Sequence, residues 1–311
     1  MGTGKGYGKT ILFGEHFVVY GLPSIVSALG AYTTADVNLL EGSGWTVSDQ
    51  RPATPGYKEL KHVEAMQAIA NIINHLKVDI KTQRIEISFS GDLIAASGVG
   101  ASAAQCTSLA RALNETFNLN LDDEKINEAA YEGEKAYHGT PSGIDNTAST
   151  YGGLIWFVKN LGAGKNTIDL LQSPRKMLIV IANSGITAST AEVVADVRRL
   201  REESPEKIQK IFGAYKKLAE TAKEALLEGD IATIGDLMNQ NHKMLQQITV
   251  SGEINDELVK IALENGALGA KLTGTGRGGL VIGLTENAGI QEKIITIIEE
   301  KGYNAWKGTI G

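Results

Sequence analysis

A short glycine-rich segment in the first third of the chain has the residue types that bind a phosphate group. Residues 97–104 read SGVGASAA and lie between an alternating apolar/polar run, residues 84–90, and a helical pattern over residues 102–117. The segment is therefore expected at a helix N-terminus, where unpaired backbone N–H groups attract an anion and glycine lets phosphate oxygens approach closely. This pattern predicts a nucleotide-binding loop, although such a turn is also an ordinary way to begin a helix.

Two better-known nucleotide motifs match the chain only in part. Residues 8–10 (GKT) resemble the end of a Walker A loop, but Thr3 occupies the position of its first glycine. Residues 98–103 (GVGASA) also match the dinucleotide pattern G-x-G-x-x-A. Asp122 or Asp123 has the spacing of a ribose-binding acid, but Asp122 is predicted to cap the next helix instead of ending a second strand. A dinucleotide site stays open as an alternative.

Three further segments place charged or catalytic residue types in turns. Residues 8–21 (GKTILFGEHFVVYG) put a Gly-Glu-His turn between two apolar runs, and a hairpin with solvated charges is the simpler interpretation. Residues 138–147 (HGTPSGIDNT) form a turn-rich loop after a predicted helix that carries Glu134, where an Asx-turn or a cap is the simpler interpretation. Residues 271–279 (KLTGTGRGG) join a helix to a strand, and they contain more glycines than a connector ordinarily needs.

The elements that must position these segments are predicted to be mixed helix and strand. Strands are predicted at residues 10–13, 17–20, 35–40, 84–90, 154–158, 177–182 and 280–285. Helices are predicted at residues 62–76, 102–117, 123–137, 190–203, 206–228, 231–246 and 255–264, with Ser189 or Thr190 as one N-cap. Residues 42–57 are predicted to be a polar loop, and residues 160–174 are the best candidate for a boundary between two halves.

Taken in this order, the four segments resemble the motifs of the GHMP kinases, and within that superfamily they are most similar to the mevalonate kinase family. The segments GEH at 14–16, VVYG at 18–21 and HGTPSGIDN at 138–146 carry the likeness to that family. The resemblance implies an α+β fold with a ribosomal protein S5-like N-terminal domain, residues 1–175, and a ferredoxin-like C-terminal domain, residues 176–311.

The resemblance also implies a reaction, the transfer of the γ-phosphoryl group of ATP, with Mg²⁺, to the 5-hydroxyl of mevalonate in isoprenoid biosynthesis. Asp145 would accept or orient the proton of the attacking hydroxyl, and Lys9 beside it would stabilise its charged form. Ser102 and Glu134 match the family's Mg²⁺ ligands, because hydroxyl and carboxylate oxygens suit this ion.

The same resemblance assigns the remaining contacts with the two substrates. Glu15, His16 and Thr273 match positions near the acceptor substrate, where His16 can hydrogen-bond a hydroxyl or, if protonated, a carboxylate. Glu15 is expected to orient Lys9 or a substrate hydroxyl. The positions that match the ATP-binding loops are Gly98, Val99, Gly100, Ala101, Ser102, Ala103, Gly274 and Gly276.

The chain departs from the family pattern at several positions near the phosphates. The family's phosphate loop commonly begins Pro-x-Gly and carries a first serine, where this chain has Ile94, Ala96 and Ala101. The cradle is therefore expected to differ in shape and in ATP affinity, with activity kept because Ser102 is retained. Arg277 replaces a glycine found in many members, and either neutralises phosphate charge or projects into solvent.

Composition limits the kind of partner. The chain has 311 residues, a net charge of −6 and a pI near 5.5, with no basic stripe, which argues against nucleic acid and anionic membrane as partners. Its single cysteine, Cys106, cannot form an internal disulfide, and its five histidines show no metal-ligand spacing, which disfavours a zinc site. We expect a cytoplasmic protein with no membrane segment, and a monomer or homodimer as among the proteins it resembles.

Three alternative functions remain from the sequence. A sister kinase acting on phosphomevalonate or another small hydroxy acid would keep the same loops. An NAD(P)-dependent oxidoreductase would use only residues 98–103 and would leave Lys9 and Asp145 without a role. A catalytically silent relative is disfavoured because Lys9, Ser102, Glu134 and Asp145 are all present.

Overall fold

The chain folds into two compact units. The computed structural model describes residues 1–95, 98–186 and 188–311. Ala96 and Ser97, which begin the predicted phosphate loop, therefore lie outside the described residues.

The chain passes more than once between the two units. Unit 1 consists of residues 1–9 and 28–152, and unit 2 consists of residues 10–27 and 153–311. Strands β1 and β2 contribute residues to both units. The division into domains at residue 175 stays a prediction.

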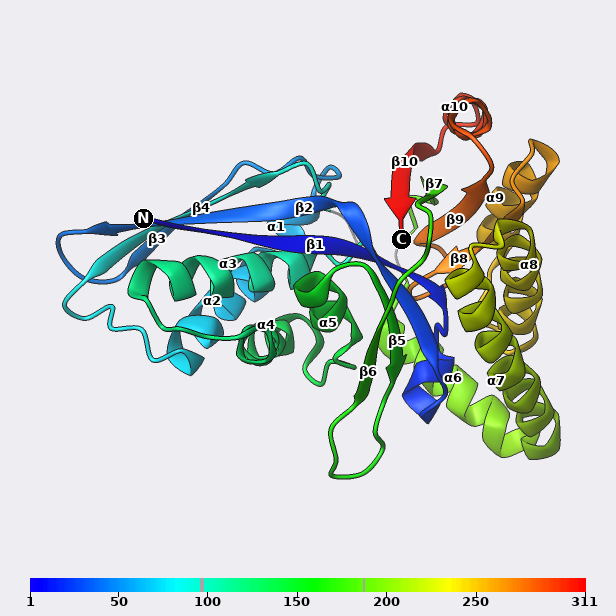
Figure 1. The fold of residues 1–311 in the computed structure, drawn as a ribbon, viewed down its shortest axis with the longest axis horizontal. Coiled ribbons are helices and arrows are strands. Elements are labelled where there is room, and N and C mark those ends of the chain that lie inside the picture. The colour runs from blue at the N-terminus through cyan, green and yellow to red at the C-terminus, as the bar shows by residue number, and fades with distance from the viewer. Residues whose placement is uncertain (96–97, 187) are drawn as a thin grey trace. The chain divides into compact units, whose positions relative to one another are not determined.

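Unit 1 combines a sheet with helices that lie on one of its faces (Figure 1). Strand β4 is antiparallel to β2 and parallel to β3. Residues of β4 alternate between exposed and buried, as expected of a strand with one covered face. The elements of this unit, including the two shared strands, are β1 (Gly2–Phe13), β2 (Ser24–Leu40), β3 (Trp45–Asp49), α1 (Tyr57–Leu60), α2 (His62–His75), β4 (Arg84–Gly91), α3 (Ala101–Phe117), α4 (Asp123–His138) and α5 (Ile144–Tyr151).

Alternating glycines let strand β1 lie directly against helix α3. A Cβ atom on Gly4 would lie 2.2 Å from the carbonyl oxygen of Ser108, and one on Gly6 would lie 2.2 Å from that of Ala104. Because real Cβ atoms do not approach a backbone oxygen so closely, only glycine allows this packing. The strand is thereby fixed along the helix, and its later residue Lys9 is brought to the start of α3.

Unit 2 contains an antiparallel sheet in the order β10-β7-β9-β8. Helices α8 and α9 pack on β8, and α10 packs on β7 and β10. In the same unit, residues Ser24–Ser27 of β2 pair with β5, which pairs with β6. The further elements are η1 (Phe17–Tyr20), β5 (Leu154–Val158), β6 (Thr167–Leu171), β7 (Met177–Asn183), α6 (Thr190–Glu203), α7 (Pro205–Glu228), α8 (Ile231–Gln247), α9 (Glu253–Glu264), β8 (Gly269–Thr273), β9 (Leu280–Thr285), α10 (Ala288–Glu300) and β10 (Asn304–Ile310).

One predicted strand is wrong, because residues 17–20 form the 3₁₀ helix η1. Positive φ angles at His16 (60°) and Gly21 (74°) turn the chain at both ends of this short apolar run. Its first residue, Phe17, is buried and stacks on Tyr215 of α7 with ring centroids 3.8 Å apart. A short apolar run of this kind does not distinguish a strand from a helix until its packing is known.

The predicted loops contain structure that the sequence did not indicate. Strand β3 lies within residues 42–57 and pairs with β4, and strand β6 lies within residues 160–174 and pairs with β5. Both strands carry polar residues because much of each is exposed, so their apolar alternation is weak. The predicted caps are confirmed: Asp122 accepts from the backbone of Lys125, and Ser189 accepts from that of Glu192. None of the helices described is both long and apolar enough to span a membrane.

Candidate active site

The lysine and the aspartate singled out from the sequence form an ion pair in unit 1. Lys9 Nζ lies 3.1 Å from Asp145 Oδ1, with the lysine buried and the aspartate about a quarter exposed. Lys9 comes from β1, where its backbone N–H donates to the carbonyl of Val99 at 2.8 Å. Asp145 lies in the first turn of α5 instead of in a loop. The expectation that these two side chains lie together is confirmed.

The described part of the glycine-rich segment leads directly into helix α3. Gly100 is the N-cap residue with φ 71°, a conformation that favours glycine. A Cβ atom at this position would lie 2.6 Å from Cγ of Lys9. Glycine is therefore needed here both for the turn and for the close approach of the lysine that pairs with Asp145.

An arginine that the sequence analysis did not single out fixes the first turns of α3. Arg51 is buried and donates to Asp49 at 2.7 Å, to the Gln105 side chain at 2.8 Å and to the carbonyl of Ala101 at 3.3 Å. Because several donors of one rigid guanidinium are used at once, the end of β3 and the start of α3 are held in one geometry.

A cavity of about 230 Å³ lies beside this network in unit 1. Its apolar side chains include Val47 and Ile69, and its polar ones include Arg51, Lys58 and Ser102. A cavity lined by apolar side chains together with cationic and hydroxyl groups suits a small organic ligand with an anionic part.

The carboxyl group of Glu134, on α4, is buried and has no hydrogen-bond partner among the described residues. Its side chain is 1% exposed, and no hydrogen bond of standard geometry reaches either of its oxygens from the described residues. Burial raises the pKa of Glu134 to about 8, and the charge of Asp145 raises it too, while the nearby Ser102 hydroxyl and Lys9 ammonium act in the opposite direction. A bound cation would remove this penalty.

The raised pKa predicts that the ligand-free protein loses stability as the pH rises. The folded state holds the Glu134 proton up to about pH 8, whereas the unfolded state loses it near the ordinary pKa of 4.5. The stabilisation is therefore complete below pH 4.5 and is lost as the pH rises through about 8. We expect the thermal midpoint of the ligand-free protein to fall over this interval, and Glu134→Gln to reduce the fall.

Glu132→Gln is the matched control for this measurement. Glu132 lies on the same helix, but its side chain is 33% exposed and pairs with Lys135. The control should keep the full pH dependence. An equal fall of the midpoint in Glu134→Gln and in the unmodified protein would contradict the prediction.

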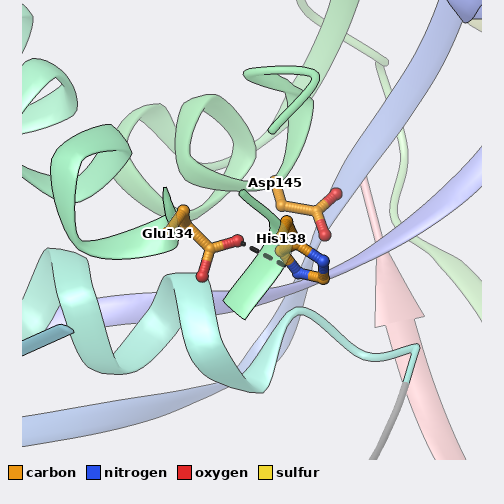
Figure 2. Close-up of side chains that lie close together, drawn as sticks. All are labelled: Glu134, His138 and Asp145. Carbon is orange, nitrogen blue, oxygen red and sulfur yellow. Dashed lines mark ion pairs between the residues drawn. The ribbon is translucent and has the colours of Figure 1, made fainter. Parts of the chain in front are cut away.

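Glu134 also belongs to a group of three possible metal ligands. One ligand atom from each of Glu134, His138 and Asp145 lies within 4.8 Å of the other two, and Figure 2 shows the three side chains gathered together. His138 Nε2 lies 3.7 Å from Oε2 of Glu134. The sequence analysis did not assign a role to His138, although its position four residues after Glu134 on one helix places both on one face.

In unit 2, a buried ion pair joins the Gly-Glu-His turn at residues 14–16 to the glycine-rich motif at residues 271–279. Lys271 Nζ donates to Oε1 of Glu15 and, at 2.7 Å, to the carbonyl of Leu272. Neither ion-paired side chain is exposed to solvent. Burial lowers the pKa of Lys271, and the charge of Glu15 opposes this effect. Glu15 thus pairs with Lys271, the first residue of the motif at residues 271–279, whereas the sequence predicted that it would orient Lys9 or a substrate hydroxyl.

His16 and Thr273 both lie in unit 2. The Thr273 hydroxyl both accepts and donates a hydrogen bond, whereas only one of the two ring nitrogens of His16 has a described partner. The Thr273 hydroxyl accepts from the N–H of Ile11 at 3.0 Å and donates to its carbonyl at 3.1 Å. His16 Nε2 lies 2.7 Å from the carbonyl of Thr275, so Nε2 carries the hydrogen. Burial lowers the pKa of His16. Its buried Nδ1 has no hydrogen-bond partner among the residues described, so the neutral ring offers one acceptor.

Arg277 holds in place the glycine-rich motif at residues 271–279, which lies in unit 2. Arg277 Nη1 lies 2.5 Å from Oδ2 of Asp196, and its Nε donates to the carbonyl of Thr249 at 3.0 Å. At Gly276, φ is 84° and a Cβ atom would lie 2.2 Å from the carbonyl oxygen of Val250. Arg277 was predicted either to neutralise phosphate charge or to project into solvent. These contacts correspond to neither prediction, because they anchor the loop that contains Arg277.

Comparison with known proteins agrees with this arrangement. The GHMP kinases N terminal domain matches residues 63–153, and the GHMP kinases C terminal family matches residues 222–304. Mevalonate kinase of Pyrococcus horikoshii is 32% identical over 94% of this chain and 91% of its own length.

Solved structures show the same likeness. The crystal structure of L. major mevalonate kinase in complex with R-mevalonate is 40% identical, covers 100% of this chain and 96% of its own, and has a TM-score of 0.94. Methanococcus jannaschii mevalonate kinase is 24% identical, covers 99% of this chain and 98% of its own, and has a TM-score of 0.80, which shows the shared fold. The expected α+β two-domain fold is confirmed. The dinucleotide alternative lacks support, since Asp122 caps a helix.

Proposed function

The chain belongs to the GHMP kinase family and, within it, to the mevalonate kinases, and on this premise we propose that it transfers the γ-phosphoryl group of ATP to the 5-hydroxyl of mevalonate. One observation carries the proposal for this chain's own residues. A buried lysine and a partly exposed aspartate lie 3.1 Å apart, and the same lysine meets the glycine at the N-terminus of helix α3.

The ion pair supplies the acid–base chemistry of the proposed reaction. Asp145 accepts the proton of the attacking hydroxyl, and Lys9 holds the carboxylate in position through their ion pair. Phosphoryl transfer depends mainly on positioning and on neutralising charge. The backbone N–H groups of residues 98–103 at the start of α3 are proposed to bind the phosphates of ATP. Gly274 and Gly276 of unit 2 are proposed as ATP-binding residues on the family resemblance alone.

Ser102 and Glu134 are proposed to hold the Mg²⁺ ion that accompanies ATP. The donor set fits, because a hydroxyl and a carboxylate are hard oxygen ligands and both Glu134 oxygens are buried without a partner among the described residues. Bound Mg²⁺ would neutralise charge on the phosphates. Ser102 also lines the cavity of unit 1, which is proposed to take the nucleoside part of ATP.

His16, Glu15 and Thr273 are proposed to serve the mevalonate side of the reaction. The free acceptor of neutral His16 suits a substrate hydroxyl better than a substrate carboxylate, which would need the protonated ring. Glu15 and Thr273 are proposed to act by fixing the backbone around His16, since their polar atoms bind Lys271 and Ile11.

A substrate panel tests the proposal. We expect MgATP-dependent release of ADP with mevalonate, and much slower release with phosphomevalonate, homoserine and galactose. Turnover confined to another member of the panel would move the chain to a sister kinase. No turnover with any of the four acceptors would contradict the proposed activity.

A further inference from the structure

We propose that Glu134, His138 and Asp145 form a binding site for Zn²⁺ that inhibits the enzyme. The site is new in its ligand set, since the proposed Mg²⁺ site uses Ser102 and Glu134 and leaves His138 without a role. Zinc binding itself is independent of the proposed function, and only its inhibitory effect rests on that function.

Two of the three ligands lie on one rigid element. Glu134 and His138 are four residues apart on α4, so both side chains project from the same face of the helix. Their ligand atoms are 3.7 Å apart, and around a tetrahedral Zn²⁺ with bonds of about 2.1 Å two ligand atoms lie about 3.4 Å apart. Little movement is therefore needed for these two side chains to bind one ion.

The third ligand can move to complete the site. The Asp145 carboxylate already lies within 4.8 Å of both other ligand atoms, and its side chain is 26% exposed. Figure 2 shows it beside the other two side chains. Rotation of this short side chain would bring one oxygen to the ion. A solvent water would then supply the fourth position, which completes a His/Glu/Asp set of the kind that zinc accepts.

Burial and exposure favour a cation at this place. Both Glu134 oxygens are buried and lack a hydrogen-bond partner in the described part of the chain, so a cation that binds there and displaces the carboxyl proton would give these oxygens the partner they lack. The His138 side chain is 48% exposed, which gives an ion from solvent a direct route. An imidazole nitrogen selects zinc over magnesium, because Mg²⁺ prefers oxygen ligands and keeps its waters.

Zinc binding would stop the proposed reaction by occupying its base. The lone pair of Asp145 that would accept the substrate proton forms the bond to the metal instead, and the ion pair with Lys9 is broken. No oxidation or reduction is involved. Because the Lys9 ammonium opposes a second cation nearby, we expect weaker binding than at a closed structural zinc site.

Calorimetric titration of ZnCl₂ into the full chain, without nucleotide or acceptor, tests the site directly. We expect one Zn²⁺ bound per chain, and an affinity for Zn²⁺ that is about 10- to 100-fold lower in His138→Ala. The matched control is His75→Ala, which removes an exposed histidine at the end of α2 and should bind as the unmodified chain does. Equal affinity in His138→Ala and the unmodified chain would overturn the proposal.

A second measurement tests the inhibition. Zn²⁺ should lower the rate with MgATP and mevalonate in the unmodified chain and in His75→Ala, and about a tenfold or higher concentration should be needed in His138→Ala. Equal inhibition of His138→Ala and the unmodified chain would overturn the inhibitory role. Because binding is measured without substrates, absence of kinase activity would contradict the proposed function and leave the zinc result intact.

Discussion

Asp145→Asn is expected to lower kcat for mevalonate phosphorylation by about 10²-fold or more, the effect ordinarily lost with a positioned general base. Asparagine keeps the size of the side chain, and its amide oxygen can still accept a hydrogen bond from Lys9. It cannot take the substrate proton at neutral pH. The effect should therefore fall on kcat, with KM for ATP changed much less, and it is measured by coupled ADP release with saturating MgATP.

Asp123→Asn is the matched control for this variant. Asp123 also lies in the first turn of a helix, but it pairs with Arg111 at the surface and its side chain is 57% exposed. Its removal should change kcat less than twofold, as about 0.4 kcal/mol of barrier would allow. Full turnover by Asp145→Asn, with the same thermal midpoint as the unmodified chain, would exclude Asp145 as the base.

The parts of the fold that the sequence predicts best are those with strong local signals. Helices α3 and α6 are predicted to within one residue because their apolar periodicity is regular over several turns and, in α6, the Ser189 cap marks the first turn. The 3₁₀ helix at residues 17–20 is mispredicted because four apolar residues carry too little periodicity. Strand β3 is missed because it is held by its pairing with β4, and no local sequence pattern predicts that pairing.

The candidate site divides in the same way. The residues of the glycine-rich segment predict a phosphate loop, although a similar turn also begins ordinary helices. The meeting of Lys9 and Asp145 could be expected only from the family resemblance, since no spacing rule relates them. Arg51 and Lys271 were missed because a lone cation in a polar or glycine-rich segment is ordinarily solvated. Their burial, and hence their structural importance, depends on partners distant in the sequence, such as Gln105 and Glu15.

The Lys271–Glu15 ion pair is expected to contribute strongly to the stability of the fold because it is buried. A charge in water loses little when its partner is removed, because solvent replaces the partner. Neither side chain of this pair is exposed, so solvent cannot replace either one without a local rearrangement. The pair joins the middle of strand β8 to the Gly-Glu-His turn that carries His16, and disrupting it should affect both stability and the acceptor side of the site.

Lys271→Met is therefore expected to destabilise the protein by about 3–5 kcal/mol, because it removes the positive charge that Lys271 supplies to the buried Glu15 carboxylate. Methionine fills much of the same volume, so the loss measures charge more than packing. The measurement is the urea midpoint of unfolding followed by circular dichroism. Where the variant remains folded, KM for mevalonate should rise more than KM for ATP, since His16 belongs to the proposed acceptor contacts.

Two further variants separate the buried charge from other effects of the substitution. Lys260→Met removes a lysine of the same kind from an exposed pair with Glu264, 3.8 Å apart, and should change stability by no more than about 0.5 kcal/mol. The double variant Lys271→Met with Glu15→Gln removes both charges and should recover part of the loss, since a neutral amide is far less costly to bury than a carboxylate that has lost the charge of Lys271. If Lys271→Met unfolds at the same urea concentration as Lys260→Met, the buried ion pair does not stabilise this fold, and the position of His16 must depend on the hydrogen bonds of Thr273 and Thr275 instead.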